Sequence, residues 1–256
     1  MQNAESVMHY CLLLLWIMKL SEDLRRDEIG ENLTLYQIKD GLLFGTDALK
    51  LADFICGAHM GSYKNAVELG TGSGAISLLL ARRGKADRIY AVEILGAYAK
   101  LAEHNAECNG LSDKIKIIHG DLRDHDSLCH GGMRISPHSA DMVFTNPPYL
   151  KGASSGKLSA TDYKNISRRE ISCTIHDVLK SAARLLKNGG DFYAVYRPDR
   201  LQSLFSAMAG HGITPKKIAF VYANRQKSSS ASLVLVKGRQ GAKEGLTVEN
   251  IFVGGN

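Results

Sequence analysis

The sequence predicts an α/β fold in which a mostly parallel β-sheet is covered by helices on both faces. From residue 64 onward, short runs rich in β-branched residues alternate with longer stretches of helical periodicity. This alternation is typical of parallel strands joined by crossover helices. The connection between the last two runs, residues 223–231, is too short for a crossover helix, so these strands should pair antiparallel.

The individual elements follow from local patterns. Asn109-Gly110 should end one helix and residues 187–190, Lys-Asn-Gly-Gly, another, because Asn and Gly accept the left-handed backbone found at helix ends. The expected strands are residues 66–69, 88–93, 114–119, 140–145, 191–196, 217–222 and 232–237. The expected helices are residues 74–83, 96–109, 171–186 and 200–208. Residues 122–139, rich in His, Gly and Ser, should form a surface loop.

Composition and charge narrow the class of protein. Of 256 residues, 45% are hydrophobic and 23% charged, which excludes a disordered chain and a fibrous repeat. The net charge is +6, but residues 1–47 carry four basic and eight acidic residues, whereas residues 216–243 carry seven basic residues and no acid. The basic segment favours a polyanionic partner. The alternative is a solvated face in a mildly basic protein.

The cysteines and the N-terminal residues indicate the compartment in which the protein works. The 5 cysteines are widely spaced without a C-x-x-C, which argues against a disulfide framework or a zinc ribbon and favours a reducing cytoplasm. Residues 11–18, CLLLLWIM, have the length of a signal sequence, but no Lys or Arg precedes them and no small-residue cleavage site follows. We expect an apolar helix or extra sequence from an upstream start codon, with a membrane-surface helix as the alternative. No apolar run reaches the roughly 20 residues that span a bilayer.

A glycine-rich turn follows the first expected strand. Residues 67–74, Val-Glu-Leu-Gly-Thr-Gly-Ser-Gly, run from a strand through this turn into a helix. Glycines permit the tight turn and a close approach of the backbone to a ligand, and amides at the helix start favour an anionic group. The turn also satisfies the dinucleotide fingerprint G-x-G-x-x-[GA], and a purely structural turn is a further alternative. The candidate cofactor-binding residues here are Glu68, Gly70, Thr71, Gly72 and Gly74.

Two acidic residues close the next two strands. Glu93 ends the second strand, where a carboxylate can accept hydrogen bonds from ribose hydroxyls. Asp121 follows the third strand and could accept from an adenine amino group. A strand-end carboxylate in solvent and a capping aspartate are the respective alternatives. Both positions should lie on the same edge of the sheet as the glycine-rich turn, because that edge collects the carboxyl ends of parallel strands.

The fourth strand runs directly into Asn146-Pro147-Pro148-Tyr149. The two prolines make a rigid corner that leaves the Asn146 side-chain oxygen and the Pro147 carbonyl as acceptors. Two acceptors suit a substrate NH₂ group, and hydrogen bonds to its hydrogens return lone-pair density to a nitrogen that is otherwise delocalised and poorly nucleophilic. Preorganised carbonyl dipoles stabilise the positive charge that then develops on nitrogen. Tyr149 offers a flat face for a planar group, and Asn146 is also a candidate cofactor-binding residue.

Together these residues resemble a class I S-adenosylmethionine-dependent methyltransferase that acts on nitrogen. An oxidoreductase would not explain Asn146 to Tyr149. Outside the shared motifs, residues 36–49 and 232–246 and the step Arg169-Glu170-Ile171 resemble the bacterial tRNA1(Val) (adenine-37 N6)-methyltransferase family. That resemblance implies a Rossmann-like, seven-stranded sheet with an antiparallel last strand, S-adenosylmethionine as cofactor and tRNA as partner. It also implies that Phe44, Thr46 and Asp47 lie near the methionine part of the cofactor.

The sequence departs from this family in three places. The first roughly 20 residues have no recognised counterpart, the loop at residues 123–139 is longer and richer in His, and the usual C-terminal prolines are missing. We expect one methyltransferase domain over residues 1–256, with an N-terminal extension at 1–45, a catalytic core at 46–238 and a C-terminal tail at 239–256. The oligomeric state is left open.

Two basic segments, residues 151–169 and 216–243, are candidates for gripping RNA phosphates beside the pocket. A solvated loop is the alternative for the first. The candidate RNA-binding residues are Lys151, Lys157, Lys164, Arg168, Arg169, Arg225 and Lys227. No metal is expected, because the spacing of the His and Asp residues between 119 and 138 fits no standard zinc pattern.

Two rival functions remain open from the sequence. A protein glutamine N5-methyltransferase of the release-factor-modifying type would use the same Asn-Pro-Pro-Tyr chemistry on a side-chain amide. A non-catalytic RNA-binding module that retains the fold is the other, although an intact glycine-rich turn, Glu93 and the Asn146 corner argue against it.

Overall fold

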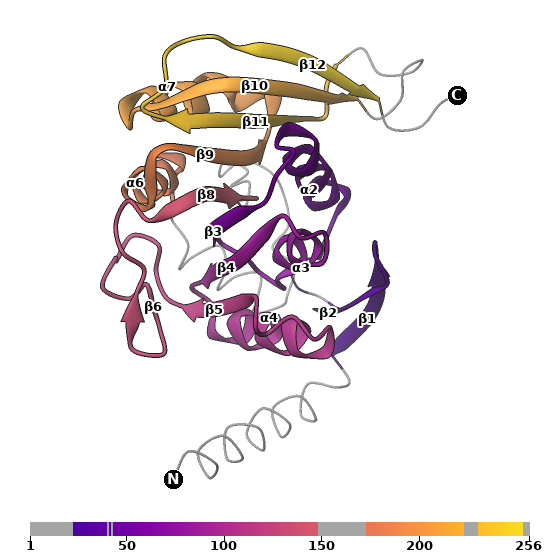
Figure 1. The fold of residues 1–256 in the computed structure, drawn as a ribbon. Helices are drawn as coiled ribbons and strands as arrows, with labels where there is room; N and C mark the ends of the chain where they lie inside the picture. The colour runs from indigo at the N-terminus through magenta and orange to yellow at the C-terminus, as the bar shows by residue number, and fades with distance from the viewer. Residues whose placement is uncertain (1–22, 40, 42, 148–172, 223–229, 253–256) are drawn as a thin grey trace.

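The computed structural model of the protein describes residues 23–39, 41, 43–147, 173–222 and 230–252. These residues form a large sheet covered by helices on both faces, with two short hairpins outside it (Figure 1). The strands of the sheet are β3 (Tyr63–Leu69), β4 (Ala86–Glu93), β5 (Ile115–His119), β8 (Ala140–Thr145), β9 (Leu186–Tyr196), β10 (Ile213–Tyr222), β11 (Leu233–Gln240) and β12 (Thr247–Phe252). The helices are α2 (Thr46–Ala58), α3 (Ala75–Arg82), α4 (Gly96–Cys108), α6 (Ile175–Leu185), α7 (Leu201–Gly210) and the 3-10 turn η1 (Pro198–Arg200).

The strands lie in the order β12-β10-β11-β9-β8-β3-β4-β5. β11 pairs antiparallel with both β9 and β10, which confirms the predicted antiparallel strand, and the other pairings in the sheet are parallel. The expected number of seven strands is wrong, because the described residues alone form a sheet of eight. The additional strand, β12, lies in the segment expected to be a tail. It is held beside β10 by an ion pair between Lys217 and Glu249 at 2.8 Å and by the packing of Ile251 on the core.

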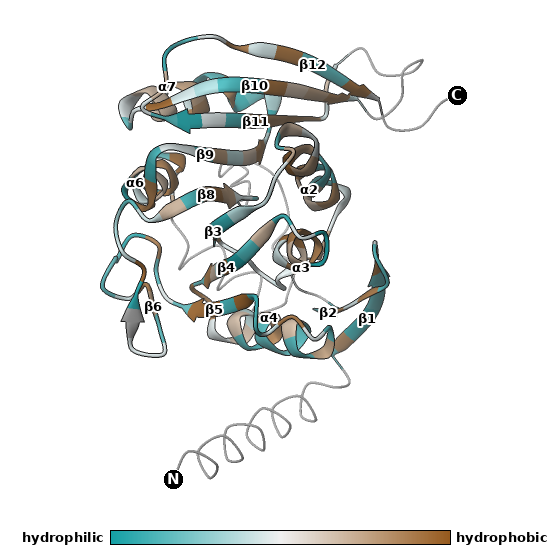
Figure 2. Ribbon diagram, viewed as in Figure 1, coloured by the Kyte–Doolittle hydropathy of each residue, from teal (hydrophilic) through white to brown (hydrophobic). Residues whose placement is uncertain are grey.

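Two apolar layers lie on opposite faces of the sheet. Side chains alternate between the layers along a strand: in β9, Tyr193 and Val195 pack with α2 and α3, whereas Ala194 packs with α6 and α7. This period of two follows from the pleat of a strand. Figure 2 shows hydrophobic residues along the central strands and on α2 and α3. The prediction of helices on both faces is therefore confirmed.

The predicted elements of the core are present, with small shifts at their ends. α6 begins after Thr174 rather than at 171, because Thr174 and Asp177 form a reciprocal capping box. The predicted helix-ending segment at 187–190 lies instead inside β9, where it forms a bulge: Ala140 pairs with Leu186, but Met142 pairs with Asp191. The glycines there relieve the crowding, and Gly189 has a φ of 78°.

Two hairpins lie outside the predicted elements. β1 (Leu24–Ile29) and β2 (Leu33–Ile38) are joined by a turn in which Glu31 and Asn32 have φ angles of 69° and 56°. Residues 122–139, expected to be a loop, contain a short hairpin of β6 (Cys129–His130) and β7 (Met133–Arg134). None of the helices in the described part of the chain is both long and apolar enough to cross a membrane.

Candidate functional site

The candidate site lies where the order of the strands reverses. From β3 the chain adds β4 and β5 on one side and then returns to place β8 on the other side of β3. Ligands of open α/β sheets bind at such a switch point, beyond the carboxyl ends of the strands. The glycine-rich turn follows β3 and Asn146-Pro147 follows β8, so the two motifs flank the same point.

The glycine-rich turn needs left-handed backbone at three positions. Gly70, Gly72 and Gly74 have φ angles of 76°, 57° and 84°, which side chains rarely permit. A Cβ added at Gly70 or Gly72 would meet no atom within 4 Å, so these two residues face open space. At Gly74 the same Cβ would lie 3.3 Å from the Cβ of Ala102, because α4 packs closely there. The turn thus presents a smooth backbone surface that a nucleotide-sized cofactor could approach.

Several amides of the turn are used inside the protein. The N–H groups of Gly70 and Thr71 donate to the Val92 carbonyl at 3.0 and 2.9 Å, and that of Gly72 donates to Glu93 Oε2 at 2.8 Å. These amides hold the turn against the end of β4. Their hydrogens are therefore engaged, and the turn offers a ligand mainly its shape and open space.

Glu68 lies beneath the turn rather than facing the open space. Its side chain has 1% of its surface exposed and accepts hydrogen bonds from the hydroxyls of Thr71, at 2.6 Å, and Ser77. Burial raises the pKa of Glu68 to about 7, although the two hydroxyl hydrogen bonds act to lower it. Glu68 thus supports the turn from beneath. The hydroxyl of Thr71 points toward Glu68 and not toward the open space above the turn.

Glu93 joins the turn to the start of α4. Its Oε2 accepts from Gly72, and its Oε1 accepts from the Leu95 N–H at 2.9 Å. Burial raises the pKa of Glu93, and the hydrogen bonds from these backbone amides act to lower it. Each carboxylate oxygen has a second acceptor site, so Glu93 retains the capacity to accept from ribose hydroxyls.

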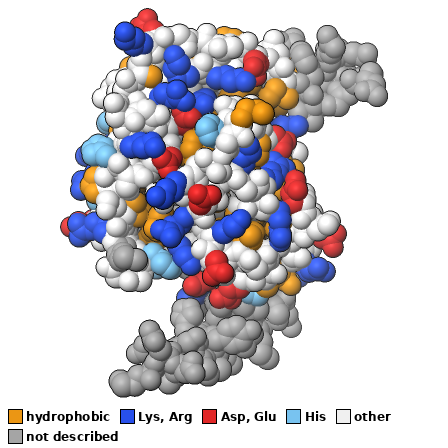
Figure 3. Space-filling view, viewed as in Figure 1, with side chains coloured by type: hydrophobic (Ala, Val, Ile, Leu, Met, Phe, Trp, Pro, Cys, Tyr) orange, Lys and Arg blue, Asp and Glu red, His pale blue; other side chains and the backbone are white. Residues whose placement is uncertain are grey.

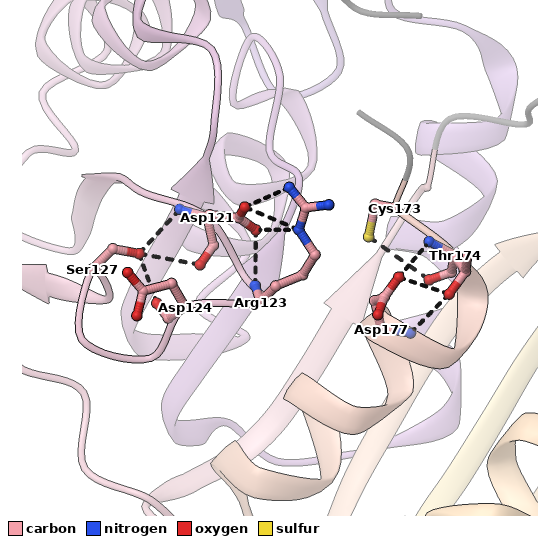
Figure 4. A network of polar contacts seen from close by, with 7 residues as sticks. All are labelled: Asp121, Arg123, Asp124, Ser127, Cys173, Thr174 and Asp177. Carbon is pink, nitrogen blue, oxygen red and sulfur yellow. Dashed lines mark hydrogen bonds and ion pairs between the residues drawn. The ribbon is translucent and has the colours of Figure 1, made fainter. Parts of the chain in front are cut away.

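Asp121 follows β5 and is engaged by a neighbour. Both of its carboxylate oxygens accept from the Arg123 guanidinium, at 2.6 to 2.9 Å, and Ser127 hydrogen-bonds its backbone (Figure 4). The hydrogen bonds from Arg123 lower the pKa of Asp121. An adenine amino group that used this carboxylate would share it with Arg123 or displace the guanidinium.

A hydrogen bond joins the end of β8, before the proline corner, to the end of β3, before the glycine-rich turn. The hydroxyl of Thr145 is buried and donates to the Leu69 carbonyl at 2.8 Å, one residue before each motif begins. Asn146 and Pro147 are half-buried beyond this link. Pro148 and Tyr149 lie outside the described residues.

The segment that holds Phe44, Thr46 and Asp47 approaches the same edge. Gln37, buried at the end of β2, accepts a hydrogen bond from the Phe44 amide. A Cβ at Gly41 would collide with the hydroxyl of Tyr98, in the first turn of α4 just after Glu93. Phe44 packs against the core, while Thr46 and Asp47 form the first turn of α2.

The basic residues divide between two edges of the sheet. Because β11 runs antiparallel to its neighbours, three of the seven basic residues in 216–243 lie toward the edge opposite the glycine-rich turn, and two lie in the middle of their strands. The three are Lys216, Arg239 and Lys243, and the two in mid-strand are Lys217 and Lys237. Contact of the segment 216–243 with RNA stays a prediction. Basic and acidic side chains are interspersed on the face seen in Figure 3.

The seven candidate RNA-binding residues, Lys151, Lys157, Lys164, Arg168, Arg169, Arg225 and Lys227, lie outside the described residues. The strand that precedes Arg225 and Lys227, β10, ends at Tyr222 on the same edge as the glycine-rich turn. Among the described residues, no cluster of three or more His, Cys, Asp or Glu side chains could hold a metal ion.

Sequence reasoning missed three side chains that organise this site: Gln37, Asn105 and Thr145. Each is at most 1% exposed and hydrogen-bonds the backbone of another element. Thr145, directly before the proline corner, carried the only local signal. The partners of the other two become apparent only once the chain is folded.

Comparisons with known proteins converge on methyltransferases. A family model described as RNA cap guanine-N2 methyltransferase matches residues 64–237. The curated tRNA1(Val) (adenine(37)-N6)-methyltransferase of Dyadobacter fermentans is 31% identical over 57% of this chain and 55% of that protein. The protein of the same name from Bacteroides thetaiotaomicron is 31% identical over 65% of this chain and 64% of its own length. The chain thus spans less than two thirds of these relatives.

Solved structures agree on the fold. A predicted O-methyltransferase from Agrobacterium tumefaciens superposes with a TM-score of 0.61 at 19% identity, covering 81% of this chain and 86% of that one. TYW2 of M. jannaschii, solved in complex with AdoMet, superposes with a TM-score of 0.55 at 14% identity, covering 85% of each chain. These likenesses support the Rossmann-like methyltransferase fold.

Proposed function

Since the chain belongs to the methyltransferase family described as RNA cap guanine-N2 methyltransferase, we propose that it transfers a methyl group from S-adenosylmethionine to an exocyclic amine of RNA. The acceptor we propose is the N6 amine of an adenine in tRNA, at position 37 of valine tRNA. The names of the curated relatives support the adenine and the tRNA. Guanine N2 and adenine N6 are both amino groups on an aromatic ring, so one arrangement of acceptors suits either.

One observation carries this proposal: the Thr145 hydroxyl ties the Asn146 corner to the Leu69 carbonyl at the root of the glycine-rich turn. A methyl transfer needs the acceptor nitrogen and the cofactor held in one fixed geometry, because fixed orientation removes much of the entropic barrier. This hydrogen bond joins the two loops that would hold the two reactants.

The residues present fit S-adenosylmethionine. Gly70 and Gly72 face open space, Glu93 keeps free acceptor sites, and Phe44 to Asp47 approach the same edge. When bound, the cofactor supplies an electrophilic methyl group on a sulfonium. Glu93 would hold the ribose, and Asp121 would accept from the adenine amino group in competition with Arg123.

On the acceptor side, the Asn146 oxygen and the Pro147 carbonyl would accept the two hydrogens of the substrate amine. These hydrogen bonds return the lone pair to nitrogen, and the same dipoles stabilise the charge that develops there. Tyr149 would stack on the base. No strong general base is needed, because the methylated nitrogen loses its proton readily.

The basic residues Lys151, Lys157, Lys164, Arg168, Arg169, Arg225 and Lys227 would grip the phosphates around a base swung out of its stack. We further propose one domain with its catalytic core at residues 46–238, working in the cytoplasm where tRNA is found.

The test is a transfer assay with radiolabelled S-adenosylmethionine and an unmodified valine tRNA transcript, followed by nucleoside analysis. We expect N6-methyladenosine, and none from a transcript in which adenine 37 is replaced. N2-methylguanosine would overturn the choice of base. Labelling of a release-factor glutamine without labelling of RNA would favour the protein methyltransferase. Loss of RNA binding should also be steep as salt rises, because phosphate contacts release counterions.

A further inference from the structure

Helix α4 holds the N-terminal hairpin with two asparagine side chains one turn apart. Asn105 accepts a hydrogen bond from the Tyr36 N–H at 2.8 Å and donates one to the Tyr36 carbonyl at 3.0 Å. Asn109 does the same with Thr34, at 2.9 and 2.7 Å. Residues i and i+4 share one helix face, and alternate residues share one side of a strand, so the two spacings match. The two amides thus act on β2 like a neighbouring strand.

Asn105 has a third bond, to the glycine-rich turn. Its second amide hydrogen goes to the Ser73 carbonyl at 2.9 Å, and the side chain has none of its surface exposed. On the same face of α4, Ala102 lies against Gly74. One buried side chain therefore links the hairpin, α4 and the turn that faces the cofactor.

The residue after Tyr36 forms a second link. Gln37 donates to Asp27 of β1 at 2.6 Å and accepts from the Phe44 amide. With 1% of its surface exposed, Gln37 has little freedom to move. The hairpin therefore reaches the candidate site twice, through Asn105 to the turn and through Gln37 to the segment of Phe44 to Asp47.

Packing alone accounts for only part of this arrangement. Leu33 and Leu35 are fully buried in the main core and anchor the hairpin there. Apolar contacts are non-directional, whereas the hydrogen bonds of Asn105 and Gln37 set distances and angles. These bonds go to the two segments that would contact the cofactor.

We propose that the β1–β2 hairpin is a working part of the cofactor site, with Asn105 as the positioning residue that couples hairpin docking to the shape of the glycine-rich turn. This inference rests on the proposed function. Coupling of this kind is reciprocal: if the docked hairpin favours cofactor binding, the bound cofactor must favour the docked hairpin by the same factor.

The first test uses the unaltered protein and S-adenosylhomocysteine as the probe, and measures hydrogen exchange at the Thr34 and Tyr36 amides. We expect saturating probe to slow exchange at both amides about tenfold, while exchange in β12, at the far edge of the sheet, stays unchanged. Binding without slower exchange at these amides would overturn the inference and leave the proposed function standing. Absence of binding would overturn both.

The second test compares two variants. Asn105→Ala and Asn109→Ala each remove both hydrogen bonds to one residue of β2, but only Asn105→Ala also removes the bond to Ser73. We expect the Kd for S-adenosylhomocysteine to rise about tenfold in Asn105→Ala, about 1.4 kcal/mol, and less than about threefold in Asn109→Ala. In Asn105→Ala the KM for S-adenosylmethionine should rise by a larger factor than turnover at saturating cofactor falls. Equal changes in Kd would contradict the role given to Asn105.

Discussion

Replacing Glu68 with Gln should change how the stability of the protein depends on pH. Burial raises the pKa of Glu68 from an ordinary value of 4.5 to about 7, against the hydrogen bonds of Ser77 and Thr71. Both hydroxyls donate to the same oxygen, Oε2, so the carbonyl of a glutamine can accept them in its place. The substitution therefore removes the titration while keeping the support of the turn.

The sign follows from proton binding. Below pH 4.5 the carboxyl is protonated in the folded and the unfolded chain, and its contribution to stability is fully present. Between pH 4.5 and about 7 the unfolded chain has lost this proton while the folded chain still holds it, so the free energy of unfolding falls as pH rises. The loss is about 3 kcal/mol and is complete above pH 7.

The assay is urea unfolding of the parent and of Glu68→Gln at a series of pH values from about 4.5 to 8. The variant should gain on the parent by about 3 kcal/mol across this range. In Ser77→Ala, which loses a hydrogen bond that lowers the pKa of Glu68, the fall in stability should begin at the same pH, extend to higher pH and be larger in total. Parallel stability curves for the parent and Glu68→Gln would refute the buried, titrating Glu68.

Three further expectations concern other parts of the molecule. Asn146→Ala should lower turnover roughly 10²-fold with little change in cofactor affinity, and full activity would exclude the acceptor role of this side chain. Asp191 forms ion pairs with Lys237 at 3.0 Å and Arg239 at 2.8 Å, so Asp191→Ala should lower the free energy of unfolding by about 3 kcal/mol because both charges lose their partner; a loss below about 1 kcal/mol in urea unfolding would argue against a stabilising role of these ion pairs. Replacing Arg225 and Lys227 with Ala should reduce the salt dependence of RNA binding by about one to two phosphate contacts, whereas Lys216→Ala at the opposite edge should not; equal effects in a filter-binding titration would contradict this division.

The central sheet could be predicted because local sequence determines it. Strands such as β8 and β4 have apolar centres with turn signals beyond their ends, and a buried parallel strand needs little else. β1 escaped prediction because its sequence, LRRDEI, is largely charged and half of its residues are exposed. β12 was missed for a similar reason, since the strand begins in an exposed segment with no apolar alternation before it.

The sequence predicts where the candidate site lies, but only part of what each of its residues does. The glycine pattern and the proline corner identify the edge of the sheet from sequence alone. Both glutamates are buried, and their hydrogen-bond partners separate them: Glu68 accepts from two side-chain hydroxyls beneath the turn, while Glu93 accepts from backbone amides at the end of β4 and has acceptor capacity left. Asn105 carried no signal, because its partners Tyr36 and Ser73 are 69 and 32 residues away along the chain.

A crystal structure of the protein with S-adenosylhomocysteine and an RNA hairpin carrying the target adenine would test the central claim most directly. The account predicts the adenine N6 about 3 Å from both the Asn146 side-chain oxygen and the Pro147 carbonyl, within hydrogen-bond distance. An adenine N6 bound beyond the reach of these two oxygens would contradict it.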